Sequence, residues 1–423
     1  MSNALLSLII FGLFILLFIW DKLPMATSAI LGCVVMVILG LSDFSTAFGQ
    51  FASTTVILLI GVMIVGSALA ETGVAAAFGR IMTRYSRNNE KIIIVVAYVL
   101  ACVLSAFLTN ATVLAIFMPI IIGMDTDDGK INHRNIVLPV LVATAMGGIS
   151  TLVGSSQQLT ANGLIEEMGY TMKVFDMTPV GAIFAIAGLL YCLFIGYPIG
   201  KKIWGNRDRF EDCEIAAAKE VNIDKRKFYT MIVITILMVI SYVVALVPPV
   251  VTAVSAALLC IITGCISQKD AVTRMNWNIV GRLGACLGLA KVISSTGGIE
   301  LITNFVSNIL GDGVSPFVLF AIMVAIIQLL SLVISNSTAI LVALPIVLSM
   351  STVMNLNPVP FAMGAAYASS MGICCPLSGS TNQMSMAAGY KFKDYFKYGV
   401  LLDIICYIIT IIFVPMFFPL TLG

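Results

Sequence analysis

Residues 109–119 read TNATVLAIFMP and residues 335–345 read SNSTAILVALP, so the chain carries nearly the same segment twice. In both copies a short run of Ser, Thr and Asn interrupts strongly apolar sequence. Asn110 corresponds to Asn336, about 225 residues later, and each segment ends at a proline. A repeat at one fixed offset indicates that the chain consists of two related halves.

A second pair of segments repeats at a similar offset. GSSQQL at 154–159 is followed by GSTNQM at 379–384, and Thr72-Gly73 recurs as Thr296-Gly297. Interrupted apolar segments at corresponding positions of two halves are typical of the binding site of a secondary transporter. Transport is therefore the function that the sequence favours first.

The composition predicts an all-α polytopic membrane protein. Sixty per cent of the residues are hydrophobic, 10% are charged and the mean hydropathy is +1.06, whereas soluble domains carry about 25% charged residues. The net charge of +2 gives no indication of a nucleic-acid partner. Residues 4–20 lack a basic lead-in and a cleavage pattern, so we expect a membrane helix there instead of a signal peptide. Nearly all of the ten cysteines lie in or beside apolar runs, which predicts small buried side chains.

Twelve apolar runs have roughly the length of a spanning helix. They cover residues 4–20, 25–41, 54–70, 92–108, 136–153, 178–199, 228–247, 250–266, 279–295, 316–334, 360–377 and 398–418. If every run crossed the bilayer, each half would have six crossings and the halves would be parallel. If one run per half instead turns back as a re-entrant hairpin, each half has five crossings and the halves are inverted.

The distribution of basic residues favours the inverted arrangement. With the connector inside, 20 of the 23 Lys and Arg residues lie on the inner face, only Lys173 lies outside, and Arg282 and Lys291 lie within a span. We therefore expect ten spanning helices, two hairpins and both termini on the outer face of the inner or plasma membrane. The expected units are a first repeat (1–199, hairpin 92–123), a connector (200–227) and a second repeat (228–423, hairpin 316–350).

The two hairpin tips have a chemistry suited to ions. Non-helical backbone at membrane depth is tolerated where it is buried in protein or lines a wet cavity. The first turn of a returning helix exposes amide donors that favour an anion. Breaks at Gly154 and Gly379 free carbonyls for a cation, and Ser105 and Ser331 place a hydroxyl one turn from each tip. Neutral oxygens suit sodium, whereas the sequence has no cluster of transition-metal ligands.

Three other interpretations compete with ion binding. Small and polar residues also stabilise the packing of membrane helices against each other, but two matching pairs of segments favour a binding function. An intramembrane enzyme would need a catalytic constellation at membrane depth. The single histidine, His133, lies in a loop instead. A receptor that kept a carrier fold without turnover is the remaining alternative.

The whole chain resembles the divalent anion/sodium symporter family, which carries dicarboxylates, citrate and sulfate within the ion transporter superfamily. The resemblance rests on residues 48–75 (FGQFASTTVILLIGVMIVGSALAETGVA), on LSAFLTNATVLAIFMP and LLSLVISNSTAILVALP, and on GGISTLVGSSQQLTANGLIEEMG. It implies a homodimer with scaffold and transport units and an elevator mechanism. It also implies a divalent anion as substrate and sodium as the co-transported ion.

The resemblance also assigns residues to the sites by position. The first sodium site would use Ser105, Thr109, Asn110 and carbonyls around Gly154, and the second would use Ser331, Asn336 and the Gly379 region. The anion would lie between the tips, against Asn110, Asn336, Ser337, Ser155, Ser380 and Thr381. This chain departs from the family where Ala111 replaces a tip threonine. It also departs where GSSQQ and GSTNQ replace Gly-Thr-Pro-Pro-Asn.

Charged residues inside apolar runs are functional candidates because they are costly there. Arg282 is a candidate counter-charge for an anion, although its place on an expected scaffold helix favours an inter-helix or dimer contact. Lys291 and Glu71 lie near helix ends, which favours snorkelling or a structural pair. Asp403 is the residue that would support a proton-coupled or antiporting relative, such as an arsenite-type or cation/proton exchanger.

Overall fold

We describe the protein from a computed structural model of the whole chain. The structure describes residues 2–20, 23–74, 77, 89–125, 131–205, 224–245, 247–298, 301 and 315–422. Most of the expected connector, 206–223, lies outside the described residues. So do eight of the basic residues used to orient the chain, namely Lys22, Arg80, Arg84, Arg87, Lys130 and the connector residues Arg207, Arg209 and Lys219.

The described part of the chain is helical, apart from turns and one isolated bridge between Leu356 and Thr421. Five of its helical stretches are long and apolar enough to cross a membrane, and six shorter apolar helices accompany them. The long stretches are Phe44–Glu71, Thr178–Trp204, Lys225–Val244, Pro316–Val333 and Phe392–Phe417. The cysteines of this part are free, and all but the half-buried Cys102 are buried. These findings confirm the predicted all-α polytopic class.

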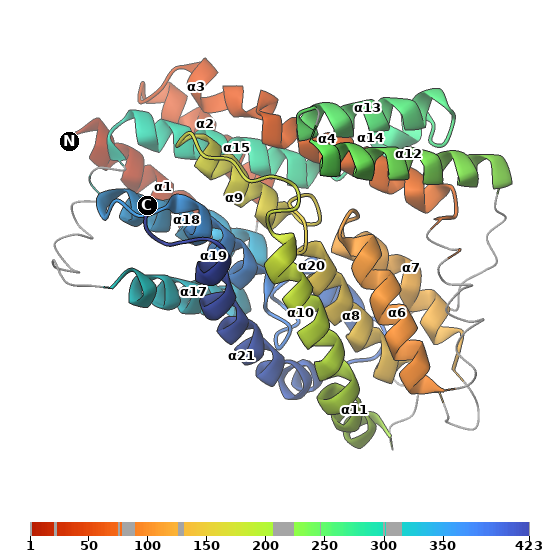
Figure 1. Cartoon of the computed structure of the whole chain (residues 1–423). Coiled ribbons are helices and arrows are strands. Elements are labelled where there is room, and N and C mark those ends of the chain that lie inside the picture. Colours follow the sequence, from red (N-terminus) through yellow and green to blue (C-terminus); the bar gives the residue numbers. More distant parts are fainter. Residues whose placement is uncertain are drawn as a thin grey trace.

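One layer of helices, here called the first layer, runs along the top of Figure 1. It contains α1 (Asn3–Trp20), α2 (Met25–Ile38), α3 (Phe44–Phe48), η1 (Gly49–Ala52), α4 (Thr54–Glu71), α12 (Lys225–Val244), α13 (Pro249–Ile262), α14 (Gln268–Thr273) and α15 (Trp277–Ser295). Helices from different halves of the chain pair in it, because α2 packs on α15 and α4 packs on α13. At Gly288 of α15 an added β-carbon would lie 2.0 Å from the Ala47 carbonyl oxygen, so this crossing requires glycine.

The second layer lies below the first in Figure 1. It contains α6 (Glu90–Ser105), α7 (Asn110–Ile122), α8 (Arg134–Gly148), α9 (Ser156–Glu166), α10 (Thr178–Tyr191), η2 (Cys192–Gly196), α11 (Tyr197–Trp204), α17 (Pro316–Val333), α18 (Asn336–Val353), α19 (Pro358–Ser370), α20 (Ser380–Met386) and α21 (Phe392–Phe417). Helix α9 also packs against α4 and α15, and it thereby joins the two layers.

Two helical hairpins occupy the second layer. Helix α6 ends at Ser105 and α7 begins at Asn110, so the first turn lies at residues 106–109, slightly earlier than the turn at 109–111 that the sequence predicts. Helix α17 ends at Val333 and α18 begins at Asn336, which gives a shorter turn. The two arms of each hairpin pack against each other.

Two helical breaks accompany the hairpins. Helix α8 ends at Gly148 and α9 begins at Ser156, and α19 ends at Ser370 while α20 begins at Ser380. The non-helical stretches 149–155 and 371–379 therefore contain Gly154 and Gly379. Helix α7 packs against α20 of the other half, and α18 packs against α9. Each returning hairpin arm thus lies beside the short helix that follows the opposite break.

Candidate functional site

The first hairpin tip is held by hydrogen bonds to the Thr109 hydroxyl and from the Ser105 hydroxyl at the end of α6. Thr109 is the N-cap of α7, and its hydroxyl accepts the Thr112 amide at 3.4 Å. The Ser105 hydroxyl, which is fully buried, donates to Asn110 Oδ1 at 2.8 Å and lies 2.9 Å from the Thr144 carbonyl oxygen. Capping groups of this kind satisfy amides that a helix start leaves unpaired. The side chain of Asn110 is therefore held from the preceding arm of the hairpin.

Glycines of the first break make room for this tip. A β-carbon added at Gly148 would lie 2.2 Å from Asn110 Oδ1, and one added at Gly154 would lie 2.4 Å from the Gly148 carbonyl oxygen. At Gly147 it would lie 2.1 Å from the Cys102 carbonyl oxygen. Any larger side chain would displace these groups. The side chain of Asn110 therefore lies directly against the backbone at the C-terminal end of α8.

The second tip has a related arrangement. Ser335 is the N-cap of α18 and accepts the Thr338 amide at 3.3 Å. The backbone amide of Asn336 donates to the Ser378 carbonyl at 2.7 Å. With the side-chain amide oriented to satisfy its neighbours, Asn336 also donates to the Ser369 and Ser378 carbonyls, at 3.1 and 2.7 Å. Asn336 therefore touches both ends of the second break.

The second break is held by two buried side chains. Asn382, which is 7% exposed, donates its side-chain amide to the Gly372 and Cys375 carbonyls at 2.8 and 2.9 Å. Asp403 of α21, which is 5% exposed, accepts the amides of Ile373 and Cys374 at 3.1 and 3.0 Å. These bonds satisfy backbone groups that lipid could not satisfy.

The structure brings some of the predicted site residues together and leaves others apart. The first tip brings together four of them, Ser105, Thr109, Asn110 and Gly154. In the second half, the Asn336 side chain lies beside Gly379, 3.2 Å from where a β-carbon added at Gly379 would stand. Ser331 instead donates to the Gln328 carbonyl of its own helix at 2.8 Å. The remaining four residues lie at the starts of α9, α18 and α20, with Ser155, Ser337 and Thr381 half-buried and Ser380 exposed.

The charged residues of the apolar runs have separate partners. Lys291 pairs with Glu167 at the end of α9, and Glu71 faces Arg274 at 3.6 Å. Both contacts are structural pairs of the predicted kind. Arg282 of α15 instead points its guanidinium at the Ser156 hydroxyl, 3.4 Å away, at the start of α9. No local sequence pattern indicated this contact, because it joins residues that lie 126 positions apart.

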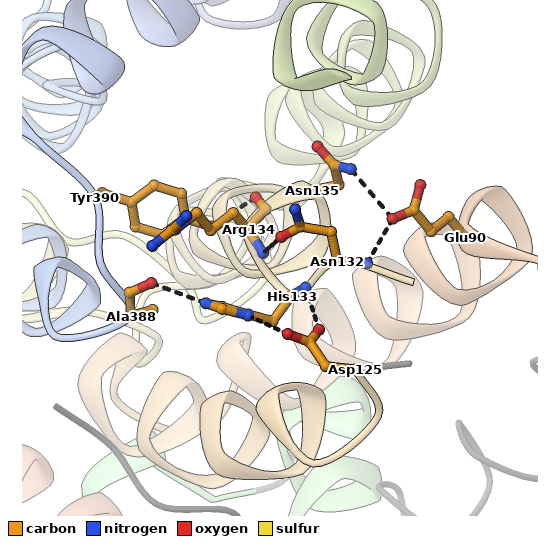
Figure 2. Close-up of polar contacts among 8 residues, drawn as sticks. All are labelled: Glu90, Asp125, Asn132, His133, Arg134, Asn135, Ala388 and Tyr390. Carbon is orange, nitrogen blue, oxygen red and sulfur yellow. Dashed lines mark hydrogen bonds and ion pairs between the residues drawn. The ribbon is translucent and has the colours of Figure 1, made fainter. Parts of the chain in front are cut away.

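A buried polar cluster lies at the other end of the first hairpin (Figure 2). Asp125 Oδ2 lies 2.7 Å from Nδ1 of the fully buried His133, and His133 Nε2 lies 2.9 Å from the Ala388 carbonyl oxygen. The hydroxyl of Tyr390 donates to the Arg134 carbonyl at 2.6 Å, and burial raises the pKa of this tyrosine well above its ordinary value. His133, expected in a loop, therefore directly precedes α8 and ties it to the segment after α20.

Glu90 extends the same cluster toward α11. Its carboxylate accepts the Asn132 amide at 2.7 Å and the Asn135 side-chain amide at 3.1 Å (Figure 2), and it pairs with Lys201 at 2.8 Å. Buried carboxylates need such partners. No sequence pattern indicated this network, which anchors the hairpin base and lies apart from the tips.

A cavity of about 480 Å³ opens between the layers, at the C-terminal end of α9. Its lining includes Phe11, Glu167, Lys291, Pro345 and Ser349. None of the predicted sodium or anion residues is among its described lining residues. Within the described part of the chain, no group of three or more His, Cys, Asp or Glu side chains forms a metal centre.

Comparisons with known proteins agree with this architecture. The family model of the citrate transporters, CitMHS, matches residues 15–352 and 313–422. An uncharacterised transporter of Synechocystis, sll0640, is 27% identical over 217 residues, which are 51% of this chain. That match spans only 34% of the relative's own length.

Two further comparisons extend over nearly the whole chain. The sodium-dependent dicarboxylate transporter SdcS of Staphylococcus saprophyticus is 19% identical over 449 residues, 96% of this chain and 84% of that protein. The crystal structure of the YdaH transporter of Alcanivorax borkumensis superposes with a TM-score of 0.63 at 12% identity, covering 88% of this chain and 87% of that one. The chain is a multi-pass membrane transporter and not an enzyme, and it belongs to the citrate transporter family.

Proposed function

We propose that this transporter is a sodium-coupled symporter of a small divalent anion, of the dicarboxylate, citrate or sulfate class. The observation that carries the proposal is the seating of Asn110 and Asn336 on the two helical breaks. Each asparagine joins a hairpin tip to freed backbone groups, so one side chain is able to serve both an ion and an anion. The sodium-dependent relative supports the choice of coupling ion.

The first sodium site would consist of Ser105, Thr109, Asn110 and carbonyls around Gly154. The Gly148 carbonyl lies close enough to Gly154 to be one of them. The second site would use Ser331, Asn336 and the Gly379 region. All of these ligands are uncharged oxygens, which bind a hard monovalent cation weakly enough to release it again.

The anion would bind between the tips, against Asn110, Asn336, Ser337, Ser155, Ser380 and Thr381. The starts of α7, α9 and α18 contribute amide donors and the positive ends of helix dipoles. Sodium in the neighbouring sites would offset the charge of the anion. Binding of either solute would therefore raise the affinity for the other, which is the physical basis of symport.

We further propose an elevator mechanism in a homodimer, with both termini on the outer face. The first layer would be the fixed scaffold, and the hairpins and broken helices of the second layer would carry the site across. The two-layer packing, in which α9 is a point of contact between the layers, supports this division. The excess of basic residues on one face supports the orientation.

The test is uptake of labelled citrate, succinate and sulfate into proteoliposomes that contain the purified chain. The proposal predicts accumulation when sodium is higher outside, and little uptake when potassium replaces sodium on both sides. Equal uptake under both conditions would reject sodium coupling. Protein-free liposomes and liposomes with an ionophore that dissipates the sodium gradient are the controls.

A proton-coupled or antiporting carrier is the second candidate, because Asp403 is a buried carboxylate attached to the second break. In that case uptake would follow a pH gradient without sodium, and Asp403→Asn would abolish it. If Asp403 only supports the break, the same variant retains sodium-dependent uptake in proportion to the folded protein present.

A further inference from the structure

Arg282 brings a positive charge from the first layer to the start of α9. It lies on α15, in a stretch that the sequence places within the membrane, and its side chain is half-buried. The guanidinium nitrogen Nη2 is 3.4 Å from the hydroxyl oxygen of Ser156, the first residue of α9. This distance is long for a hydrogen bond from a charged donor.

Within the described residues, Arg282 has no carboxylate partner. Other charged side chains of this part do have partners, for example in the ion pairs His133–Asp125, Lys201–Glu90, Arg274–Glu71 and Lys291–Glu167. Lys291 lies nine positions further along the same helix and has a carboxylate partner, Glu167, as expected of a charge with a structural role. An uncompensated cation at membrane depth is costly, and such residues typically face a substrate or ion pathway.

The first turn of α9, which Arg282 contacts at Ser156, contains further polar groups. Ser155 is the N-cap of this 11-residue helix, but its side chain makes no capping bond to the first-turn amides. Gln158 lies in the same turn and is 0% exposed, and its amide nitrogen has no partner among the described residues. Its amide oxygen is occupied by the Ser155 hydroxyl. A buried donor without an acceptor is costly, so the site lacks an acceptor group.

We propose that Arg282 is the fixed counter-charge of the transported anion and binds one of its carboxylate or other oxyanion groups beside Ser155, Ser156 and Gln158. The inference rests on the proposed function and adds a residue to its site. An oxyanion here would accept from the guanidinium, from the Gln158 amide and from the first amides of α9. It would thereby supply the missing acceptor and compensate the isolated cation.

The position of Arg282 also makes this contact dependent on the state of the carrier. Arg282 belongs to the first layer, and Ser156 belongs to the second. A displacement of one layer against the other separates the two residues, so the anion is held by the arginine at one end of the transport cycle only. Arg282 is therefore a specificity residue that contacts the anion only in the state in which the two layers lie as they do here.

The experiment uses the full chain purified in detergent, with melting temperature measured against increasing citrate, succinate or sulfate at constant sodium. The variants are Arg282→Gln, Arg282→Lys and, as a matched loss of one positive charge, Lys269→Gln on the exposed part of α14. Each variant is also melted without added anion. Wild type and Lys269→Gln should gain stability with the same half-saturating anion concentration.

Arg282→Gln should raise that concentration at least about tenfold, the effect of one charge-assisted hydrogen bond. Arg282→Lys should raise it less. Without anion, Arg282→Gln should melt no lower than wild type, because an uncompensated charge has been removed.

An unchanged anion response in Arg282→Gln would overturn the inference and leave the proposed function intact. A large fall in the anion-free melting temperature of both Arg282 variants would assign the residue a structural role instead. No response of wild type to any of the three anions would reject the proposed function itself.

Discussion

Gly148 and Asn110 lie in such close contact that a single added carbon would separate them. A β-carbon at Gly148 would be 2.2 Å from Asn110 Oδ1, far inside a normal contact distance. The end of α8 and the tip of the first hairpin can therefore pack this closely only because residue 148 is a glycine. This contact links the first repeated motif to the first helical break.

Gly148→Ala should consequently abolish transport, because the methyl group must push Asn110 out of its position. Gly379→Ala is the matched variant in the other half, where the added carbon would lie 3.2 Å from the Asn336 side chain and small shifts accommodate it. We expect Gly379→Ala to retain a measurable fraction of wild-type uptake. Uptake into proteoliposomes, normalised to folded protein, checks both. Equal activity of Gly148→Ala and wild type would refute the proposed contact.

Ser105 and Ser331 occupy corresponding positions, but they differ in what their hydroxyls bind. Ser105 donates to Asn110, whereas Ser331 donates to its own helix. Ser105→Ala removes both a proposed sodium ligand and the hydrogen bond that holds Asn110. It should raise the sodium concentration for half-maximal uptake by roughly tenfold, equivalent to one lost hydrogen bond. Ser331→Ala should have the smaller effect, and the reverse order would count against the geometry of the first tip.

The first effect that we expect from replacing Asp403 is a loss of stability. Asp403→Ala leaves the buried amides of Ile373 and Cys374 without acceptors. The expected loss is roughly 2–4 kcal/mol of unfolding free energy, visible as a lower melting temperature in detergent. Asp403→Asn keeps one acceptor oxygen and should lose less. A variant Asp403→Ala as stable as wild type would mean that the second break is held by Asn382 and its neighbours alone.

The sequence predicted the parts of this structure that depend on local patterns. Repeated Ser, Thr and Asn residues inside apolar sequence indicated the two hairpin tips, and glycines indicated the two breaks. Apolar run length indicated the helices. These features are encoded within a few residues of where they act, so a single sequence reveals them.

Contacts between segments that are distant in the sequence could not be predicted from such local patterns. The bond from Asp403 to the second break, the burial of His133 between Asp125 and Ala388, and the reach of Arg282 to Ser156 all join distant segments. Each depends on how helices pack, which periodicity and composition do not determine. Ser331 illustrates the same limit, because its symmetry with Ser105 in sequence did not extend to its hydrogen bond.

The decisive measurement for the proposed transport site is sodium-driven citrate uptake by Asn110→Ala and Asn336→Ala, each compared with wild type at equal amounts of folded protein. Both asparagines touch a helical break and lie in a proposed sodium site and in the anion site. We expect each variant to reach the membrane in normal amounts and to melt near the wild-type temperature, but to lose sodium-driven uptake. Normal uptake by both variants would contradict the assignment of the hairpin tips as the transport site.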